Sequence, residues 1–281
     1  MGIFDGALIA CDIDGTIMTG GVIPQKNIDA IEYFKSEGGN VCLATGRTAP
    51  ALNPVLSQYN GYGPCVVGNG SMIYDSITGE ILYEVCIEKS EFSCVEAALL
   101  ADPTVGIELH AGRTVYKLTV TEETVVHQRY ELIDAVPITL EEAKKLNLNK
   151  ILYLFENEEQ KKRVKDAVLA AAKESSFSDT YVMIEGKMRI YLEHMPKEVS
   201  KSATLLRMLD ITGARRDRFF AIGDGFNDID MLKTSSFSAC PAGAPEEVKC
   251  QADIIVGEVQ NGALADFIDI IKRRLNNGCK D

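Results

Sequence analysis

The sequence predicts an α/β protein in which a doubly wound, mostly parallel sheet is interrupted by an inserted α+β segment. Short continuous apolar runs alternate with helical patterns over residues 1–75, and the alternation returns after residue 200. Buried parallel strands have such apolar runs because helices cover both faces of their sheet. The length of 281 residues also suits two units better than one.

Residues 1–75 are predicted to form, in order, a strand, a helix, a strand, a helix and a strand. Ile31 and Phe34 lie at helical spacing in the first helix, and a break is expected near Pro54 in the second. The expected elements are a strand at 7–11, a helix at 24–38, a strand at 41–44, a helix at 48–59 and a third buried strand at 65–67. Two short strands, at 72–74 and 81–83, predict a hairpin at the boundary of this segment.

The middle of the chain follows a different order. We therefore assign residues 87–190 to the insertion, and residues 1–86 and 191–281 to a discontinuous core. The expected elements of the insertion are a helix at 90–100, strands near 105–120 and 150–155, a charged amphipathic helix at 158–173 and strands near 181–192. The core resumes with a helix at 202–209, strands at 219–222, 237–240 and 253–256, and a last helix at 263–275.

Charge and composition narrow the class of partner. The 41 acidic and 29 basic side chains give a net charge of −12, which repels nucleic acid and anionic membranes. We expect no nucleic-acid or membrane partner, but a small anionic substrate can still bind beside a metal ion. The eight cysteines form no CxxC pair, and the N-terminus lacks the features of a signal peptide, so a cytoplasmic protein is expected.

The motif D-I-D-G-T at residues 12–16 follows the first apolar strand directly. Ligands of such sheets bind at the carboxyl ends of the strands, and a period of two directs Asp12 and Asp14 to the same side. An EF-hand is a poor alternative because Ile17 stands at the position that requires glycine. A solvated Asp-rich turn remains the simple alternative for this motif alone.

A second acidic motif, G-D-G-F-N-D at residues 223–228, also follows an apolar strand. It is not a dinucleotide-binding loop, because Asp228 stands where GxGxxG requires glycine. If both strand ends line one crevice, Asp12, Asp14, Asp224 and Asp228 crowd together and require a cation. Oxygen ligands without histidine favour Mg²⁺. Taken singly, this loop could be an ordinary turn.

Two further pieces could complete an anion site. Thr45, Gly46 and Arg47 follow the second strand and are expected to open a helix, whose N-terminus would favour an anion. Lys201 begins the helix that returns to the core. Taken alone, Thr45 could be a plain helix cap and Lys201 a surface lysine.

These motifs together resemble the haloacid dehalogenase (HAD) superfamily of phosphatases, specifically its Cof-type, subfamily IIB, branch. Residues 12–16 match the first motif, DxDGT, and residues 45–47 match the second, Thr-Gly-Arg. Lys201 matches the third motif, and residues 223–228 match the fourth, GDxxND. Residues 68–71 are similar to the SNGA segment of this branch, although Gly68 replaces its usual serine. The match extends over nearly the whole core and implies a Rossmann-like core with an inserted cap domain.

The resemblance implies a Mg²⁺-dependent phosphomonoesterase that works through an aspartyl-phosphate. Asp12 would be the nucleophile and Asp14 the general acid and base. Other implied roles are metal binding by Asp12, the Asp14 main-chain carbonyl, Asp224 and Asp228, and phosphate contacts by Lys201, Thr45, Gly46, Arg47, Asn69 and Asn227.

The insertion corresponds to the cap, which would contact the leaving group of a small phosphorylated metabolite, expected to be a sugar phosphate. The cap residues to inspect first are Arg113, Lys117, Lys187, Arg189 and Tyr191, and Arg189 is our candidate for substrate binding. A phosphomutase of the same superfamily and a phospho-accepting receiver are the alternatives. The receiver is disfavoured because its chain would be uninterrupted. The oligomeric state is expected to be a monomer or a small homo-oligomer.

Overall fold

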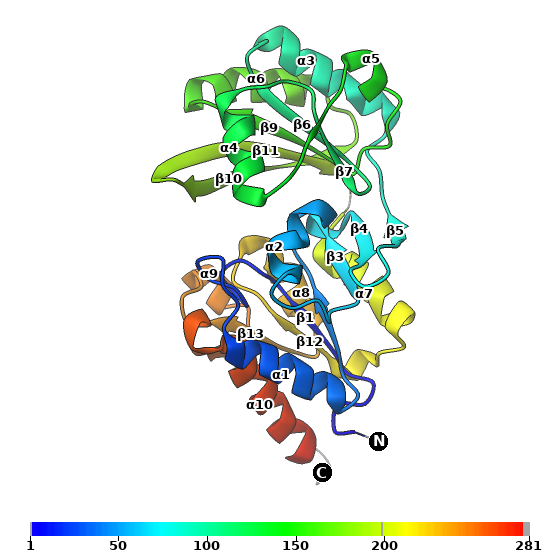
Figure 1. The fold of residues 1–281 in the computed structure, drawn as a ribbon, viewed down its shortest axis with the longest axis vertical. Coiled ribbons are helices and arrows are strands. Elements are labelled where there is room, and N and C mark those ends of the chain that lie inside the picture. The colour runs from blue at the N-terminus through cyan, green and yellow to red at the C-terminus, as the bar shows by residue number, and fades with distance from the viewer. Residues whose placement is uncertain (1, 198, 278–281) are drawn as a thin grey trace. The chain divides into compact units, whose positions relative to one another are not determined.

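The computed structural model describes residues 2–197 and 199–277, and the chain divides into two compact units (Figure 1). The core unit comprises Met1–Arg47, Pro54–Leu82 and Ser200–Asp281, and the inserted unit comprises Thr48–Asn53 and Tyr83–Val199. The inserted unit therefore extends beyond the predicted limits of 87–190. Its C-terminal limit lies later than predicted because its last strand continues to Pro196 without a break.

The core unit is built on a parallel sheet with the strand order β14-β13-β12-β1-β2. These strands are β1 (Leu8–Cys11), β2 (Asn40–Leu43), β12 (Phe219–Ile222), β13 (Phe237–Pro241) and β14 (Ile254–Val256). After β1 the chain forms β2 on one side of β1. After β12, which lies on the other side of β1, it forms β13 and then β14 farther out on that side. The strand order thus reverses between β1 and β12, which is where doubly wound sheets bind their ligands.

Helices pack in pairs around this sheet. The helix α1 (Gln25–Ser36) packs on α10 (Ala263–Asn277), and α7 (Lys201–Thr212) packs on α8 (Ile229–Thr234). All four residues of β1 and of β12 are buried, as their apolar runs predict. The predicted fold class, a doubly wound α/β core with an insertion, is confirmed.

The expected third buried strand is present, and its bridge toward β2 keeps the predicted parallel direction, but its ladder partner is antiparallel. The strand β3 (Pro64–Val67) is antiparallel to β4 (Met72–Asp75), and with β5 (Ile81–Glu84) it forms a separate three-stranded sheet. A single bridge, Ala44 to Val66, connects it to the end of β2. A buried run of apolar residues fits either arrangement, so its pattern could not decide the partner.

The inserted unit contains a six-stranded sheet with the order β10-β11-β9-β6-β7-β8, in which only β7 and β8 are parallel among the described pairs. The strands are β6 (Gly106–Ala111), β7 (Thr114–Lys117), β8 (Val136–Pro137), β9 (Lys150–Phe155), β10 (Ser175–Ile184) and β11 (Lys187–Pro196). The helices are α3 (Ser93–Ala101), α4 (Glu122–Glu131), α5 (Leu140–Ala143) and α6 (Glu158–Ala171).

Both faces of β9 are covered, and this explains its continuous apolar sequence. Ile151, Tyr153 and Phe155 belong to the larger core of the unit, which includes residues of the packed helices α3 and α6. Leu152 and Leu154 instead join a smaller cluster with Val126 of α4. The helix α4 was not predicted. Its N-terminus is marked in the sequence by the capping box of Thr121 and Thr124 and by the acidic residues Glu122 and Glu123 in its first turn.

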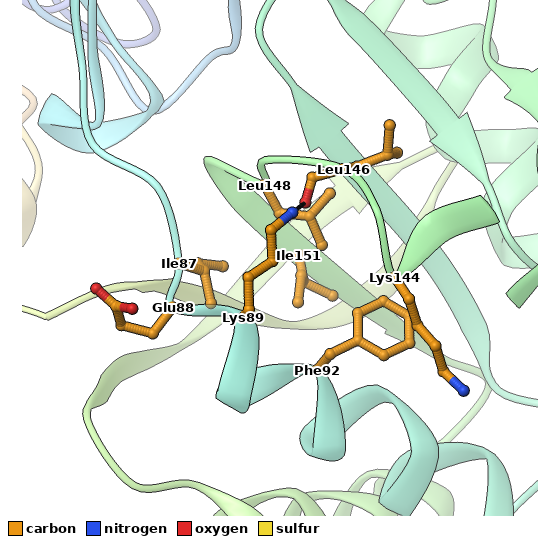
Figure 2. A pocket seen from close by; sticks show the side chains of 8 residues that line it. All are labelled: Ile87, Glu88, Lys89, Phe92, Lys144, Leu146, Leu148 and Ile151. Atoms are coloured by element: carbon orange, nitrogen blue, oxygen red, sulfur yellow. Dashed lines mark hydrogen bonds between the residues drawn. The ribbon is translucent and has the colours of Figure 1, made fainter. Parts of the chain in front are cut away.

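A small pocket in the inserted unit lies beside Ile87, Phe92 and Leu148 (Figure 2). Its volume of about 10 Å³ has room for roughly one water molecule and not for an organic substrate. Lys89 lies at this pocket and donates hydrogen bonds to the carbonyl oxygens of Lys145 and Leu146. Within the described part of the chain, no helix combines the length and the apolar character that crossing a membrane would require.

Candidate active site

The two acidic motifs lie side by side at the carboxyl ends of β1 and β12. Cys11 pairs with Ile222 in register, and the backbone N–H of Asp12 donates to the carbonyl oxygen of Ile222 at 3.0 Å. The parallel register therefore brings Asp12 and the loop that follows β12 together, as the sequence predicted.

Lys201 is the cation at the centre of this site. It is the first residue of α7, and its side chain is buried. Its Nζ atom lies 2.7 Å from Oδ1 of Asp12 and 2.6 Å from Oδ1 of Asp228. Burial disfavours the charge of Lys201, but the two carboxylates outweigh it and raise the lysine pKa above its ordinary value. The possibility of a surface lysine is therefore excluded.

Asp228 organises the loop in which it lies. Its second oxygen, Oδ2, accepts hydrogen bonds from the backbone N–H groups of Asp224, at 3.1 Å, and Gly225, at 2.8 Å. A Cβ atom on Gly223 would lie 2.6 Å from the Asp228 side chain, so glycine is required there. With Lys201 on its other oxygen, Asp228 is held from both sides.

Asp224 is held by the first motif. Thr16 donates a hydrogen bond from Oγ1 to Oδ1 of Asp224 at 2.5 Å. Gly15 has φ +84°, and a Cβ atom there would lie 2.3 Å from Asp224, so both conformation and space require glycine. No local pattern in the sequence indicates this role of Thr16, because its partner lies 208 residues away.

Three of the four predicted acids could share one cation. Asp12, Asp224 and Asp228 each offer a carboxylate oxygen, and these atoms lie within 4.8 Å of one another. Burial, followed by the charge of Asp228 among the nearby acids, raises the pKa of Asp12 well above its ordinary value despite Lys201. Burial and Asp228 also raise the pKa of Asp224 to about 6, although Thr16 opposes this. The acids thus disfavour one another's charge.

Asp14 makes a different contact from the other three acids. Its carboxylate forms a two-point ion pair with Arg47, with Nε to Oδ2 at 2.7 Å and Nη2 to Oδ1 at 3.0 Å. The Asp14 side chain is half exposed. The side chain of Asp14 is therefore outside the group of oxygens that Asp12, Asp224 and Asp228 form, whereas the predicted metal contact of Asp14 is through its main chain.

The predicted phosphate-binding residues of the core also lie near one another. Thr45 is buried, and its Oγ1 accepts a hydrogen bond from the backbone N–H of Arg47 at 3.1 Å. The backbone N–H of Asn69 donates to the carbonyl oxygen of Thr45 at 2.9 Å, and the Asn227 amide donates to Oδ1 of Asn69 at 2.9 Å. A Cβ atom on Gly46 would lie 3.1 Å from Asn69.

The helix expected at 48–59 is only partly formed. A short 3₁₀ helix, η1 (Ala49–Leu52), begins two residues after Arg47 and leads into the four-residue α2 (Asn53–Leu56). Pro54 lacks the N–H group that one continuous helix over 48–59 would use at this position. Any anion contact of Thr45 must therefore come from its hydroxyl and from backbone N–H groups, not from a helix dipole.

Arg189 lies in β11 of the inserted unit, and its side chain is buried. Its Nη1 atom lies 2.7 Å from Oε1 of Glu123 in α4, and Lys187 reaches the same oxygen at 2.9 Å. The residue thus connects β11 to α4. A contact of Arg189 with substrate stays a prediction.

Comparison with known proteins agrees with the motifs. The model of the haloacid dehalogenase-like hydrolase family matches residues 9–268. A protein of Streptococcus pyogenes serotype M6, named "putative phosphatase", is 27% identical over 93% of this chain and 96% of its own. The pyridoxal phosphate phosphatase YbhA of Escherichia coli K12 is 23% identical over 93% of this chain and 97% of its own.

Solved structures share the fold. The structure of a HAD subclass IIB sugar phosphatase, BT4131, superposes with a TM-score of 0.77 at 20% identity, over 94% of this chain and 98% of that chain. The structure of TM0651 from Thermotoga maritima gives a TM-score of 0.78 at 20% identity, over 94% of this chain and 97% of that chain.

Proposed function

The chain belongs to the haloacid dehalogenase-like hydrolases, and from this premise we propose that it is a Mg²⁺-dependent phosphomonoesterase that acts through an aspartyl-phosphate. One observation carries the proposal. Asp12 stands at the reversal of the strand order, with Lys201 on one of its oxygens and Asp224 and Asp228 beside it. A buried carboxylate fixed by a lysine at this position is suited to act as a nucleophile.

In the first step, the Asp12 carboxylate attacks phosphorus. The bond between phosphorus and the alcohol oxygen breaks, and Asp14 gives a proton to that oxygen. In the second step, Asp14 takes a proton from water, which attacks the same phosphorus. The bond to Asp12 then breaks, so that inorganic phosphate leaves, Asp12 is again a carboxylate, and Asp14 again carries the proton with which it began. Asp14 suits this role because it is half exposed and can meet both the leaving group and water.

Arg47 orients Asp14 in this mechanism. Its two contacts with the carboxylate restrict the direction in which Asp14 presents its oxygens. Lys201, Thr45, Gly46, Asn69 and Asn227 are proposed to contact the transferring phosphoryl oxygens. Preorganised donors of this kind stabilise charge that develops in the transition state.

The donor set fits Mg²⁺. The three carboxylates of Asp12, Asp224 and Asp228 face one ammonium group, that of Lys201, which leaves a formal charge of −2. An ion of charge +2 balances this, and oxygen ligands are those that Mg²⁺ prefers. Asp12, Asp224 and the Asp14 main-chain carbonyl would hold the ion, and Asp228 would support it. The ion supplies positive charge that lets an anionic nucleophile approach an anionic phosphate.

The substrate is proposed to be a small phosphorylated metabolite, with sugar phosphates first. The motifs of the core unit are proposed to bind the phosphoryl group and the metal ion. Recognition of the leaving group is therefore assigned to the inserted unit, including Arg189. The similar proteins support this class of substrate, since one is named a sugar phosphatase and another a pyridoxal phosphate phosphatase.

Phosphate release from p-nitrophenyl phosphate and from a panel of sugar phosphates tests the proposal. We expect turnover with Mg²⁺ and none after treatment with EDTA. Asp12→Asn should abolish turnover, whereas Asp210→Asn, at an exposed position of α7, should keep it. Undiminished turnover by Asp12→Asn, or by metal-free enzyme, would refute the proposal. Conversion of one sugar phosphate into an isomer without phosphate release would identify a mutase instead.

A further inference from the structure

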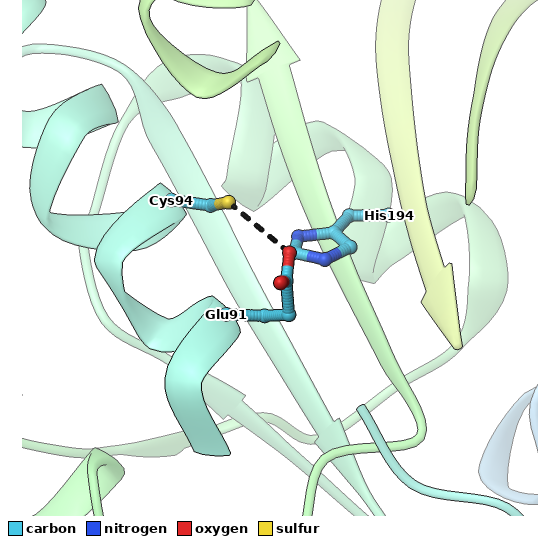
Figure 3. A group of neighbouring side chains, drawn as sticks. All are labelled: Glu91, Cys94 and His194. Carbon is cyan, nitrogen blue, oxygen red and sulfur yellow. Dashed lines mark hydrogen bonds between the residues drawn. The ribbon is translucent and has the colours of Figure 1, made fainter. Parts of the chain in front are cut away.

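A second group of metal-ligand side chains lies in the inserted unit, among residues that the phosphatase mechanism does not use. Glu91 comes from η3 (Lys89–Phe92), Cys94 from α3 and His194 from β11 (Figure 3). One ligand atom of each lies within 4.8 Å of the others. All three residues have 0% exposure.

The geometry of the group approaches that of a tetrahedral metal site. Sγ of Cys94 lies 3.8 Å from Oε2 of Glu91. Sulfur and oxygen ligands at about 2.3 Å and 2.0 Å from a tetrahedral zinc ion lie roughly 3.5 Å apart. Figure 3 shows the imidazole ring of His194 directed toward the Glu91 carboxylate. Small side-chain rotations would therefore close the three ligands around one ion.

His194 supplies an independent indication of a ligand. Its Nε2 atom is buried and has no hydrogen-bond partner. A buried polar atom without a partner is costly, and such atoms are rare in folded proteins. Burial lowers the pKa of His194 to about 4, so the ring is neutral at neutral pH and keeps a lone pair available for a metal.

Surrounding groups hold the three side chains in place. The backbone N–H groups of Lys173 and Glu174 donate to Oε1 of Glu91, each at 3.0 Å. The hydroxyl of Tyr153 lies 3.4 Å from Nδ1 of His194, and the ring of Phe177 packs against the imidazole. Outer groups that orient ligands in this way are typical of metal sites in proteins.

We propose that Glu91, Cys94 and His194 bind one Zn²⁺ ion, with a water molecule as the fourth ligand. A thiolate, a carboxylate and a neutral imidazole balance the charge of the ion, which is what a fully buried site requires. A mixed sulfur, nitrogen and oxygen set selects zinc over Mg²⁺. Binding converts the Cys94 thiol to a zinc thiolate and releases one proton to solvent.

The site would clamp the two ends of the inserted unit. Glu91 and Cys94 follow shortly after Tyr83, where the longer segment of that unit begins, and His194 precedes Val199, where it ends. A bound ion would tie these segments together, so its role is structural. This inference does not depend on the phosphatase activity.

Cobalt substitution of the full-length protein tests the site. Protein stripped with a chelator is titrated with Co²⁺ in excess Mg²⁺, which fills the carboxylate site of the core unit. We expect one equivalent of Co²⁺ to give an absorption band from thiolate-to-cobalt charge transfer. Added Zn²⁺ should displace the Co²⁺ and remove the band. A wild-type protein that gives no such band would overturn the proposal.

Matched variants identify the ligands. Cys94→Ser should abolish the band, and His194→Gln should weaken Co²⁺ binding by more than about 10-fold, the lower end of the loss seen for residues that only support a ligand. Cys250→Ser, which changes an exposed cysteine, should match the wild type. The proposal is overturned if Cys94→Ser keeps the band. His194→Gln keeps every cysteine, so it tests the imidazole ligand separately from the thiolate. Unchanged Co²⁺ binding by this variant would also overturn the proposed zinc site.

Discussion

Lys201 determines the charge balance of the active site. Its ammonium group is the partner of two buried carboxylates, Asp12 and Asp228, at 2.7 and 2.6 Å. A buried ion pair contributes little over an apolar replacement of the whole group, but removal of one partner leaves a buried charge without compensation. Lys201 therefore supports both the fold and Asp12, the proposed nucleophile.

Lys201→Met should lower the free energy of unfolding by about 3–5 kcal/mol at neutral pH, because methionine fills the space but leaves Asp12 and Asp228 without a cation. Urea unfolding in the presence of EDTA measures this change. Lys197→Met removes a half-exposed lysine, whose nearest described carboxylate lies 3.7 Å away, and should change stability little. Equal effects of the two substitutions would contradict the assigned role.

Asp12 and Asp14 should respond differently to the same substitution. Asp14→Asn leaves the nucleophile intact and removes proton transfer, so kcat should fall by about 10² to 10⁴. A covalent phosphate should still form slowly on this variant from p-nitrophenyl phosphate, which has a good leaving group. Rapid-quench labelling detects it. A covalent phosphate on Asp12→Asn would show that another residue is the nucleophile.

The position of α7 depends on contact with the turn η2 (Gly68–Gly70). Gly70 has φ +103°, and a Cβ atom there would lie 2.3 Å from the carbonyl oxygen of Ser200, just before Lys201. Thr204 of α7 donates a hydrogen bond from Oγ1 to the carbonyl oxygen of Gly70 at 2.6 Å. The turn and the helix therefore position Lys201 together.

Gly70→Ala should move the start of α7 and lower kcat by more than 10-fold, because the added methyl group collides with backbone that cannot yield easily. The control is Gly213→Ala at the end of α7, where φ is +67° but no atom lies within 4 Å of the added Cβ. This control should lose about 1–2 kcal/mol of stability and keep its kcat. Steady-state kinetics and urea unfolding of both variants measure these effects. Equal kcat values for Gly70→Ala and Gly213→Ala would contradict the role of Gly70 in positioning Lys201.

At the scale of the whole molecule, the two units respond to different conditions. The carboxylate site of the core unit is proposed to bind metal and phosphate, whereas the inserted unit buries a histidine, His110, in its neutral form. His110 is 3% exposed, and both of its ring nitrogens lack hydrogen-bond partners. Burial, followed by the charges of Lys150 and His127, lowers the pKa of His110 well below 6.5.

The inserted unit should therefore lose stability as the pH falls below 6.5. The unfolded chain then binds a proton at residue 110 while the folded chain does not, so the free energy of unfolding decreases by up to about 1.4 kcal/mol per pH unit. His110→Gln should reduce this slope by roughly half a proton at pH 6.5, rising to about nine-tenths of a proton at pH 5.5. Urea unfolding followed by circular dichroism at each pH measures the slope.

The pH range from 7.5 to 8.5 serves as the internal control. His110 is neutral in both the folded and the unfolded chain there, so the wild-type and variant slopes should coincide. Identical slopes below pH 6.5 would mean that His110 does not resist protonation in the fold.

Local patterns were sufficient to predict the core of this protein. Continuous apolar runs predicted β1, β2, β12 and β13 because almost all residues of these strands are buried, and a short apolar run predicted the partly exposed β14. The acidic motifs follow β1 and β12. A parallel sheet brings the carboxyl ends of adjacent strands together, so strand order and motif position implied the meeting of Asp12 with residues 223–228. Most of the candidate site could be derived in this way.

Only the tertiary structure decided which groups meet across long stretches of chain. The same apolar pattern allowed β3 a parallel or an antiparallel partner, and nothing local placed Arg47 on Asp14 or buried Arg189 against Glu123. The cluster of Glu91, Cys94 and His194 likewise joins His194 to two residues that precede it by 103 and 100 positions. Periodicity reports which face of an element is buried, but packing and charge compensation select the partner, and both depend on the whole fold.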